Sequence, residues 1–440
     1  MKSTLYTIAF FSVLFLGCQY SDDDETELLD PDIPVEDLIN GAILNLAYQE
    51  GEAARLAGVW TSQFNEADRT IPYLLPGFRD PEDFNDLWGL LYTNGYILAL
   101  RAEQAAAEEE SPFQEAVAKI LRAHYIAETA LMFGDVPFSQ VGDILAFPDP
   151  VFDGQAEVIE RAIDLLEESL AETAGEAITD NNSILTGTAT WAQFANALIA
   201  RYNLALQNFP EALAAAEAAA INSEEAEIKI MHDSIEGSFN LFHAFTSRNR
   251  FGVITLEESF LYKTLISDGE LSRADDKTND AARYAYYVDS TSSMEYPNTS
   301  NSGFFAAAAD YPLVSMPEMK LIIAECAARA GNLDQSVMAL NEARGYWDTK
   351  FGTGNYLDYV STDSAVQPDQ LLKTILLEKF VSVIGLPTLY DMARTNNLIG
   401  STLNGGNELA QRFLYPQSEE NGNENFPGHH SVFDVAPINQ

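Results

Sequence analysis

The chain has 440 residues, of which 67 are acidic and 24 are lysine or arginine, so its formal net charge is −43. This charge argues against nucleic acid and anionic membrane surfaces as partners, because the protein's own field repels polyanions. A polyanionic ligand is also disfavoured unless a local basic pocket or bound cations intervene. Hydrophobic residues make up 47% of the chain, which is enough for a large core in one elaborated domain.

The first 17 residues are typical of a signal peptide rather than of folded structure. Lys2 supplies a positive charge, and the apolar run at 5–16 is too short to span a bilayer comfortably. The Leu-Gly-Cys sequence that ends at Cys18 resembles a bacterial lipobox, so we expect Cys18 to be lipidated and residues 18–35 to form an acidic tether. The alternative is an ordinary signal peptide that contains a cysteine. No other segment is apolar enough to cross a membrane.

The acidic run at 21–25 and the single remaining cysteine extend this interpretation. The run resembles the surface-export signal of Bacteroidetes lipoproteins, which places the protein on the outer leaflet; a solvated tether is the alternative. With Cys18 lipidated, Cys326 has no partner for an intramolecular disulfide. It lies on the apolar side of a predicted helix, so we expect it to be a buried small hydrophobe.

A helix predicted over residues 36–57 is followed by a long loop with candidate binding residues. Prolines and glycines between 58 and 83 forbid a long helix there. Long loops rich in aromatic and amide side chains are where binding residues tend to lie. The candidates in this loop are Trp60, Asn65, Asp68, Arg69 and Tyr73. For Trp60 the alternative role is to anchor the loop to the core.

Helical periodicity then returns and continues, with interruptions, as far as residue 221. We expect helices at 83–107, 112–133, 155–174, 188–207 and 210–221. Trp88 and His124 lie on helical patterns where a packing role is the usual one.

Residues 316–345 show two helical patterns separated by a Gly331-Asn332 turn. This arrangement is typical of a tetratricopeptide (TPR) hairpin. Gly331 suits the left-handed position that ends a helix, and Asp334 can start the next one. Two other segments share the pattern, at offsets of 124 and 197 residues, so that Ala200 and Ala127 both correspond to Ala324. Uneven spacing of the copies predicts insertions between them.

The larger insertion spans about 232–315 and the smaller about 346–367. Glycines and prolines punctuate the larger one, which is rich in tyrosine and phenylalanine. It supplies the further candidates Asn249, Arg250, Tyr296 and Phe304. A last helix is expected at about 369–394, followed by an irregular tail from 413.

Four segments in this order resemble the SusD/RagB family of Bacteroidetes nutrient-binding outer-membrane lipoproteins. They are Leu121–Phe138, with its Phe-Gly-Asp-Val-Pro run at 133–137, Glu318–Gly331, Leu377–Thr395 and Arg412–Pro416. The resemblance covers essentially the whole mature chain. The sequence departs from the family pattern at Lys379, Phe380 and Ala393, which we expect to be structural positions, and 232–312 matches no transferable pattern.

The resemblance implies an all-α fold: a TPR-containing SusD-like scaffold with an irregular, loop-rich ligand-binding overlay. The SusD-like domain then spans 36–440, with TPR-like parts at about 36–231 and 316–395. The resemblance also implies a lipid-anchored outer-membrane protein that faces the cell exterior. Such a protein captures oligosaccharide, or in some members peptide, and delivers it to a SusC-like TonB-dependent transporter. The TPR helices face the transporter, and the ligand lies on the opposite, loop-rich side.

A sugar site needs flat rings for the C–H faces and polar groups for the hydroxyls. For stacking we predict Trp60, Tyr73, Tyr296 and Phe304, and for hydroxyl recognition Asn65, Asp68, Arg69, Asn249 and Arg250. The net charge favours a neutral glycan such as a β-glucan or a chitin fragment. Peptide capture is the second ligand class.

Catalysis is not expected, although a surface glycoside hydrolase is a third alternative. A glycosidase needs two carboxylates around the scissile bond, and among 67 acidic residues such a pair carries no information. Hydrolase, metalloprotease and phosphate-loop sequence motifs are absent. The adjacent His429 and His430 lack a third ligand nearby, so we expect neither a metal nor a cofactor. A TPR scaffold that binds only another protein explains the helices but not the aromatic loops.

Overall fold

Most of the chain is helical, and its strands are short. The protein is described from a computed structural model over residues 33–67, 74–180, 182, 184–291, 294–352, 354–403 and 408–440. Cys18, Asp68, Arg69 and Tyr73 lie outside the described residues, as do the predicted signal peptide and all but the end of the predicted tether. Val35–Gln440 forms one compact unit.

The helices form the scaffold, and the short strands connect loops by antiparallel pairing. The α-helices are α1 (Val35–Trp60), α2 (Asn85–Leu91), α3 (Ile97–Glu108), α4 (Pro112–Phe133), α5 (Gln155–Ser169), α6 (Trp191–Ala205), α7 (Phe209–Ala219), α8 (Leu241–His243), α9 (Phe260–Leu265), α10 (Ala281–Tyr287), α11 (Met316–Arg329), α12 (Leu333–Phe351), α13 (Leu371–Ser382), α14 (Leu386–Arg394) and α15 (Gln417–Gly422). Two π-helical segments, Tyr92–Tyr96 and Ala244–Asn249, continue α2 and α8.

The described strands pair antiparallel in four small sheets. They are β1 (Asn65–Glu66) with β6 (Ile254–Thr255), β2 (Val136–Pro137) with β3 (Phe152–Asp153), β7 (Val288–Asp289) with β8 (Tyr296–Pro297), and the order β4 (Leu185–Thr186), β5 (Ile228–Ile230), β9 (Tyr311–Val314). The β1–β6 and β5–β9 pairs join segments that are far apart in the chain. These pairings hold the loops between them in place.

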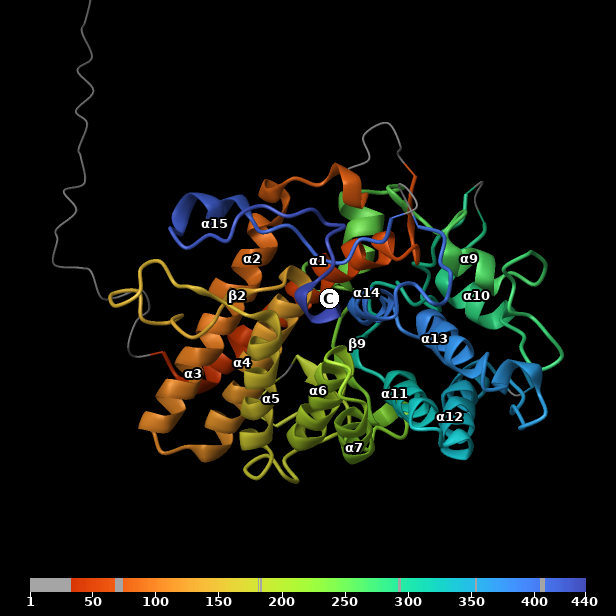
Figure 1. Ribbon diagram of the computed structural model, residues 1–440, viewed down its shortest axis with the longest axis horizontal. Helices are drawn as coiled ribbons and strands as arrows, with labels where there is room; N and C mark the ends of the chain where they lie inside the picture. Colours follow the sequence, from red (N-terminus) through yellow and green to blue (C-terminus); the bar gives the residue numbers. More distant parts are fainter. Residues whose placement is uncertain are drawn as a thin grey trace, which may run out of the picture. The chain divides into compact units, whose positions relative to one another are not determined.

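The TPR-like hairpins form one continuous array in space although the chain interrupts them. Helices α3, α4, α5, α6, α7, α11 and α12 pack neighbour against neighbour in that order, as Figure 1 shows along its lower side. The equivalent residues Ala127, Ala200 and Ala324 are fully buried, because small side chains let the next helix approach closely. The predicted all-α, TPR-like fold class is therefore confirmed.

Local differences from the sequence prediction have simple causes. Asn332, rather than Asp334, caps α12, because its side chain accepts a hydrogen bond from the amide of Gln335. Helix α12 continues to Phe351, so the smaller insertion begins later than residue 346. The predicted helix at 369–394 is divided into two helices at Gly385, whose φ is +109°. A side chain does not fit there, because a Cβ would lie 2.7 Å from that of Ala54.

Trp60 belongs to an aromatic core between α1, α2, α4 and the C-terminal tail. Only 1% of its surface is exposed, and its ring meets those of Phe84 and Phe413 edge to face, with centroids 6.5 and 4.8 Å away. Its indole Nε1 donates to the carbonyl of Leu74 at 3.0 Å. Neither face of the ring is open to solvent, so in this structure Trp60 anchors the loop to the core, which is the alternative role given above.

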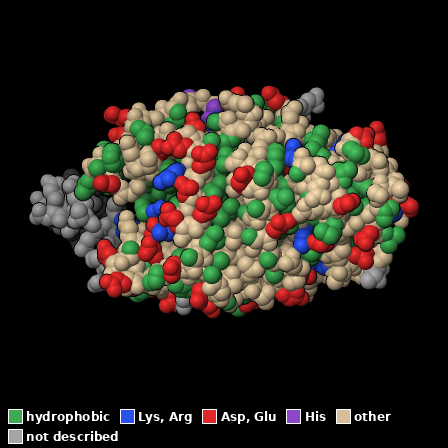
Figure 2. All heavy atoms as spheres, turned by 60° about the horizontal axis from the view of Figure 1, so that its bottom comes forward, with side chains coloured by type: hydrophobic (Ala, Val, Ile, Leu, Met, Phe, Trp, Pro, Cys, Tyr) green, Lys and Arg blue, Asp and Glu red, His purple; other side chains and the backbone are tan. Residues whose placement is uncertain are grey.

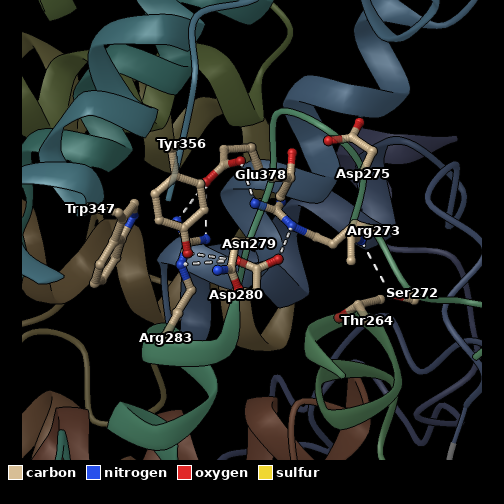
Figure 3. A network of polar contacts seen from close by, with 12 residues as sticks. Thr264, Ser272, Arg273, Asp275, Asn279, Asp280, Arg283, Trp347, Tyr356 and Glu378 are labelled. Carbon is tan, nitrogen blue, oxygen red and sulfur yellow. Dashed lines mark hydrogen bonds and ion pairs between the residues drawn. The ribbon is translucent and has the colours of Figure 1, made fainter. Parts of the chain in front are cut away.

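A buried carboxylate with three guanidinium groups joins the larger insertion to the scaffold (Figure 3). Glu378 of α13 accepts from Arg273 at 2.7 Å and from Arg283 of α10 at 3.0 Å, and Arg344 of α12 lies 3.6 Å away. Asp280 is the second carboxylate and pairs with Arg273 at 2.6 Å. Burial opposes ionisation of Glu378, but the three guanidinium groups hold its pKa well below its ordinary value.

We predict that Glu378→Gln lowers the free energy of unfolding by about 3–5 kcal/mol near neutral pH, because it leaves buried cations uncompensated. The folded-state pKa of Glu378 is depressed, so the wild-type advantage is present above the unfolded-state pKa of about 4.3 and declines as pH falls below it. Denaturant unfolding from pH 7 to 3 measures this. Glu160→Gln, an exposed change on α5, is the control. An equal, small effect of both substitutions contradicts the role of the cluster.

Trp60→Ala should destabilise the protein by about 3–5 kcal/mol, the usual cost of deleting a fully buried large aromatic side chain. Thermal and denaturant unfolding measure the loss. Phe251→Ala removes a ring that is 75% exposed and should change stability by less than about 1 kcal/mol. A stable Trp60→Ala variant that has lost ligand affinity would restore Trp60 as a contact residue.

Candidate ligand-binding site

The two candidate loops meet through the β1–β6 pair. Asn65 pairs with Thr255, and Glu66 with Ile254. The Asn65 Nδ2 donates to the carbonyl of Glu257 at 3.2 Å, and its Oδ1 accepts from the amide of Glu66 at 2.9 Å. Asn65 is 7% exposed, so its amide serves to hold the two loops together.

An exposed aromatic pair lies directly after the π-helical segment Ala244–Asn249. Phe251 is 75% exposed, and its ring faces that of half-buried Tyr296 with centroids 5.7 Å apart and planes 34° apart. The amide of Val253 donates to the carbonyl of Arg250, and Gly252 adopts a φ of +79°, which together turn the chain tightly at Phe251. This turn exposes the ring although exposure costs hydrophobic free energy.

Polar candidates stand next to this pair in the chain. Asn249 and Arg250 are both exposed and immediately precede Phe251. An amide and a guanidinium that precede an exposed ring in the chain are hydrogen-bonding groups of the kind that a sugar site needs. Among the predicted binding residues that the structure describes, Asn249 and Arg250 precede Phe251 in the chain and Tyr296 contacts its ring. π-helical segments occur frequently at functional sites, which agrees with this location.

A second aromatic pair interacts with Glu295, the residue that precedes β8. Tyr262 of α9 and Tyr284 of α10 have ring centroids 5.9 Å apart and planes 56° apart, and both are half-buried. Glu295, the residue before Tyr296, interacts electrostatically with both tyrosines. Burial and the Glu295 carboxylate are among the causes that raise the pKa of Tyr284 to about 12.

Phe304 lies apart from these pairs. Its ring contacts those of Phe305, Tyr287 and Tyr286, with centroids 4.9, 5.4 and 5.7 Å away. It borders a small internal cavity of about 20 Å³. The structure therefore places Phe304 in a packing cluster and not beside Phe251.

Sequence reasoning did not select Phe251, Tyr262, Tyr284 or Glu295. Phe251 carried the clearest signal, because it sits between an Arg-Asn-Arg run and a glycine. The two tyrosines stand on short helices that the sequence pattern did not reveal, and their pairing depends on how those helices pack.

The opposite, helical part of the molecule carries grooves of its own. One groove of about 740 Å³ lies between α12 and residues 358–368, and exposed Leu333, Met338 and Val360 line it. A smaller groove of about 230 Å³ between α7, α11 and α12 shares Met338 and Glu342. Figure 2, which turns the lower side of Figure 1 forward, shows hydrophobic side chains among many carboxylates and few cationic groups.

The described residues lack two kinds of feature. They contain no group of three or more His, Cys, Asp or Glu side chains arranged to hold a metal ion. Among the described helices, none combines the length and apolar character that a membrane span requires.

Solved structures with the same fold are numerous, though distant in sequence. A SusD homolog from Bacteroides uniformis superposes with a TM-score of 0.69 at 15% identity, covering 90% of this chain and 98% of that one. A chitin-binding SusD homolog from Flavobacterium johnsoniae gives 0.64 at 16%, covering 92% and 97%. A SusD/RagB family protein from Bacteroides thetaiotaomicron gives 0.63 at 19%, covering 89% and 95%.

The family comparison is more specific than the structural likeness. No curated protein sequence matches the chain. The profile of the SusD-like family described as "Starch-binding associating with outer membrane" matches residues 30–256, which is more than half of the chain. That description agrees with an exposed aromatic surface beside hydrogen-bonding side chains, and it supports glycan binding as the class of function. The chain belongs to this SusD-like family of starch-binding proteins associated with the outer membrane.

Proposed function

We propose that the protein captures an oligosaccharide or polysaccharide at the cell surface and delivers it to a SusC-like TonB-dependent transporter. The observation that carries this proposal is the Phe251–Tyr296 pair, in which an exposed phenylalanine stands beside exposed Asn249 and Arg250. Exposing a large aromatic ring is unfavourable without a ligand, and sugar faces stack on such rings. Membership of a family described as starch-binding supports the same class of ligand.

The ligand in this proposal is a neutral glycan such as a β-glucan. A net charge of −43 disfavours uronic-acid polymers. Chitin, a neutral polymer, is what the Flavobacterium johnsoniae homolog is described as binding. Peptide capture is the second ligand class, and catalysis is not part of the proposal.

The proposed location is the outer leaflet of the outer membrane, through a lipid on Cys18. The lipobox-like sequence and the acidic run that follows it support this location. The family description, association with the outer membrane, agrees with it.

The grooved helical side is the proposed docking surface for the transporter. Its exposed apolar residues Leu333, Met338 and Val360 surround one groove, with Asp334 and Asp358 also on its walls. A contiguous apolar surface rimmed by charge is typical of protein–protein contacts. Ligand capture at Phe251 and docking at α12 then use different elements of the same chain.

We predict that Phe251→Ala weakens glycan binding about tenfold, because stacking on an aromatic ring contributes about 1.5 kcal/mol. Calorimetry and affinity electrophoresis of a soluble form that begins at Glu25 measure this, against β-glucan, starch, chitin oligosaccharides, uronic-acid polymers and peptides. Phe147→Ala, at a ring that is 43% exposed in the 138–151 loop, is the matched control and should bind normally. A folded protein that binds peptides and no glycan would establish the second ligand class.

Met338→Glu should reduce recovery of the co-expressed SusC-like transporter about tenfold while glycan affinity stays unchanged. The reason is that a carboxylate placed in an apolar contact must be desolvated without a partner. Affinity purification from detergent-solubilised membranes measures transporter recovery. Met231→Glu, at a methionine that is 42% exposed elsewhere, is the control. Full transporter recovery with Met338→Glu would remove this groove from the docking surface.

A further inference from the structure

The Tyr262–Tyr284 pair has the composition of a site for a cation rather than for a second neutral sugar face. The two rings come from different helices, α9 and α10, and are tilted by 56° with centroids 5.9 Å apart. Tilted, half-buried rings at this spacing can both present their π faces to one small group. The negative face of an aromatic ring attracts an ammonium ion that approaches to within about 6 Å of the ring centroid.

Contacts within both helices fix the positions of the two rings. Ser259 caps α9 by accepting a hydrogen bond from the amide of Tyr262 itself. Helix α10 carries Arg283, which is fully buried and bound to Glu378, directly before Tyr284. The ion cluster therefore fixes the backbone that positions one of the two rings.

A carboxylate lies beside the rings. Thr255 and the amide of Leu256 both donate to the carbonyl of Glu295, which holds the backbone of this residue against β6. Within the described residues its buried side-chain Oε2 has no hydrogen-bond partner, while a hydrogen bond between its carboxylate and the Tyr284 hydroxyl is among the causes that raise the pKa of Tyr284. A buried carboxylate oxygen without a donor is costly, and a ligand N–H that donates to it removes the cost.

The surroundings add negative charge. After burial, the negative charges of Glu295, Glu258, Glu257 and Asp268 raise the pKa of Tyr262 above its ordinary value. Lys263 lies 3.1 Å from Glu258 and neutralises part of this charge. The local field therefore favours a cation and repels a carboxylate.

We infer that Tyr262, Tyr284 and Glu295 form a subsite for a protonated primary amine on the captured ligand. The amine is that of a glucosamine unit in a glycan or that of a lysine side chain in a peptide, which share this chemistry. The inference rests on the proposed capture function. It adds a charge preference to that function: at this subsite an amino sugar is preferred to a neutral sugar, and a uronic acid is rejected.

The test compares ligands that differ only in the amine. The full-length protein in detergent is titrated by calorimetry at pH 6, where an amine with a pKa of about 8 is protonated. One arm uses a glucosamine tetramer and its N-acetylated counterpart, and the other uses a lysine-containing peptide and its acetyl-lysine counterpart. We expect the glucosamine tetramer to bind about tenfold more tightly than the N-acetylated one, since a cation–π contact with a charge-assisted hydrogen bond is worth about 1.5 kcal/mol.

Glu295→Gln and Tyr262→Ile should each reduce the ratio of the two affinities from about ten to about one. The two variants perturb different groups, and thermal unfolding verifies that each is folded. Phe251→Ala is the matched control, because it should weaken both tetramers alike and preserve their ratio. A preference for the amine in the peptide arm alone, sensitive to Glu295→Gln, supports the subsite and assigns it to a peptide ligand.

Equal binding of both tetramers by the wild-type protein overturns the amine subsite and leaves glycan capture intact. A preference that persists in both folded variants overturns it as well. Failure to bind any tetramer or peptide overturns the subsite, whereas the proposed function is decided separately by the β-glucan and starch titrations described above.

Discussion

The irregular half of this protein depends on one buried carboxylate. Glu378 on α13 binds Arg273 and Arg283 from the larger insertion (Figure 3). Arg344 of α12 lies 3.6 Å from its carboxylate. The insertion contains few residues in long regular elements, so backbone hydrogen bonds alone fix it poorly. Buried charges must be compensated by other groups of the protein. The insertion meets this requirement where its Arg273 and Arg283 reach Glu378 of the helical array. The position of α10, and hence of Tyr284, follows from it.

The same residue types serve opposite purposes in the two halves. Trp60 ends a long helix and faces Phe84 and Phe413, so its ring strengthens the core. Phe251 follows a π-helical segment in a tight turn at Gly252, so its ring remains in water. Backbone geometry rather than residue chemistry therefore decides which aromatic groups are free for a ligand. A rigid array of TPR-like hairpins leaves the short helices and turns above it to carry recognition.

The sequence was sufficient for the scaffold and insufficient for the site. Helical periodicity located α4 at Pro112–Phe133, and small residues such as Ala324 identified the repeated hairpins, because both signals are local. The break at Gly385 was missed, since the clash of a side chain with Ala54 depends on a distant helix. The structure places Tyr296 against the ring of exposed Phe251 and buries Trp60, and the sequence does not distinguish the two cases, because burial is settled by tertiary packing. The Tyr262–Tyr284 pair has no sequence signature at all.

Amide hydrogen exchange, measured with and without saturating glycan, shows whether the insertion or the helical array holds the ligand. We expect slower exchange in residues 245–256, 260–265 and 294–298 when glycan is bound, with no change in α11 and α12. Protection confined to α11 and α12, or absent from the insertion while calorimetry reports binding, would contradict this expectation.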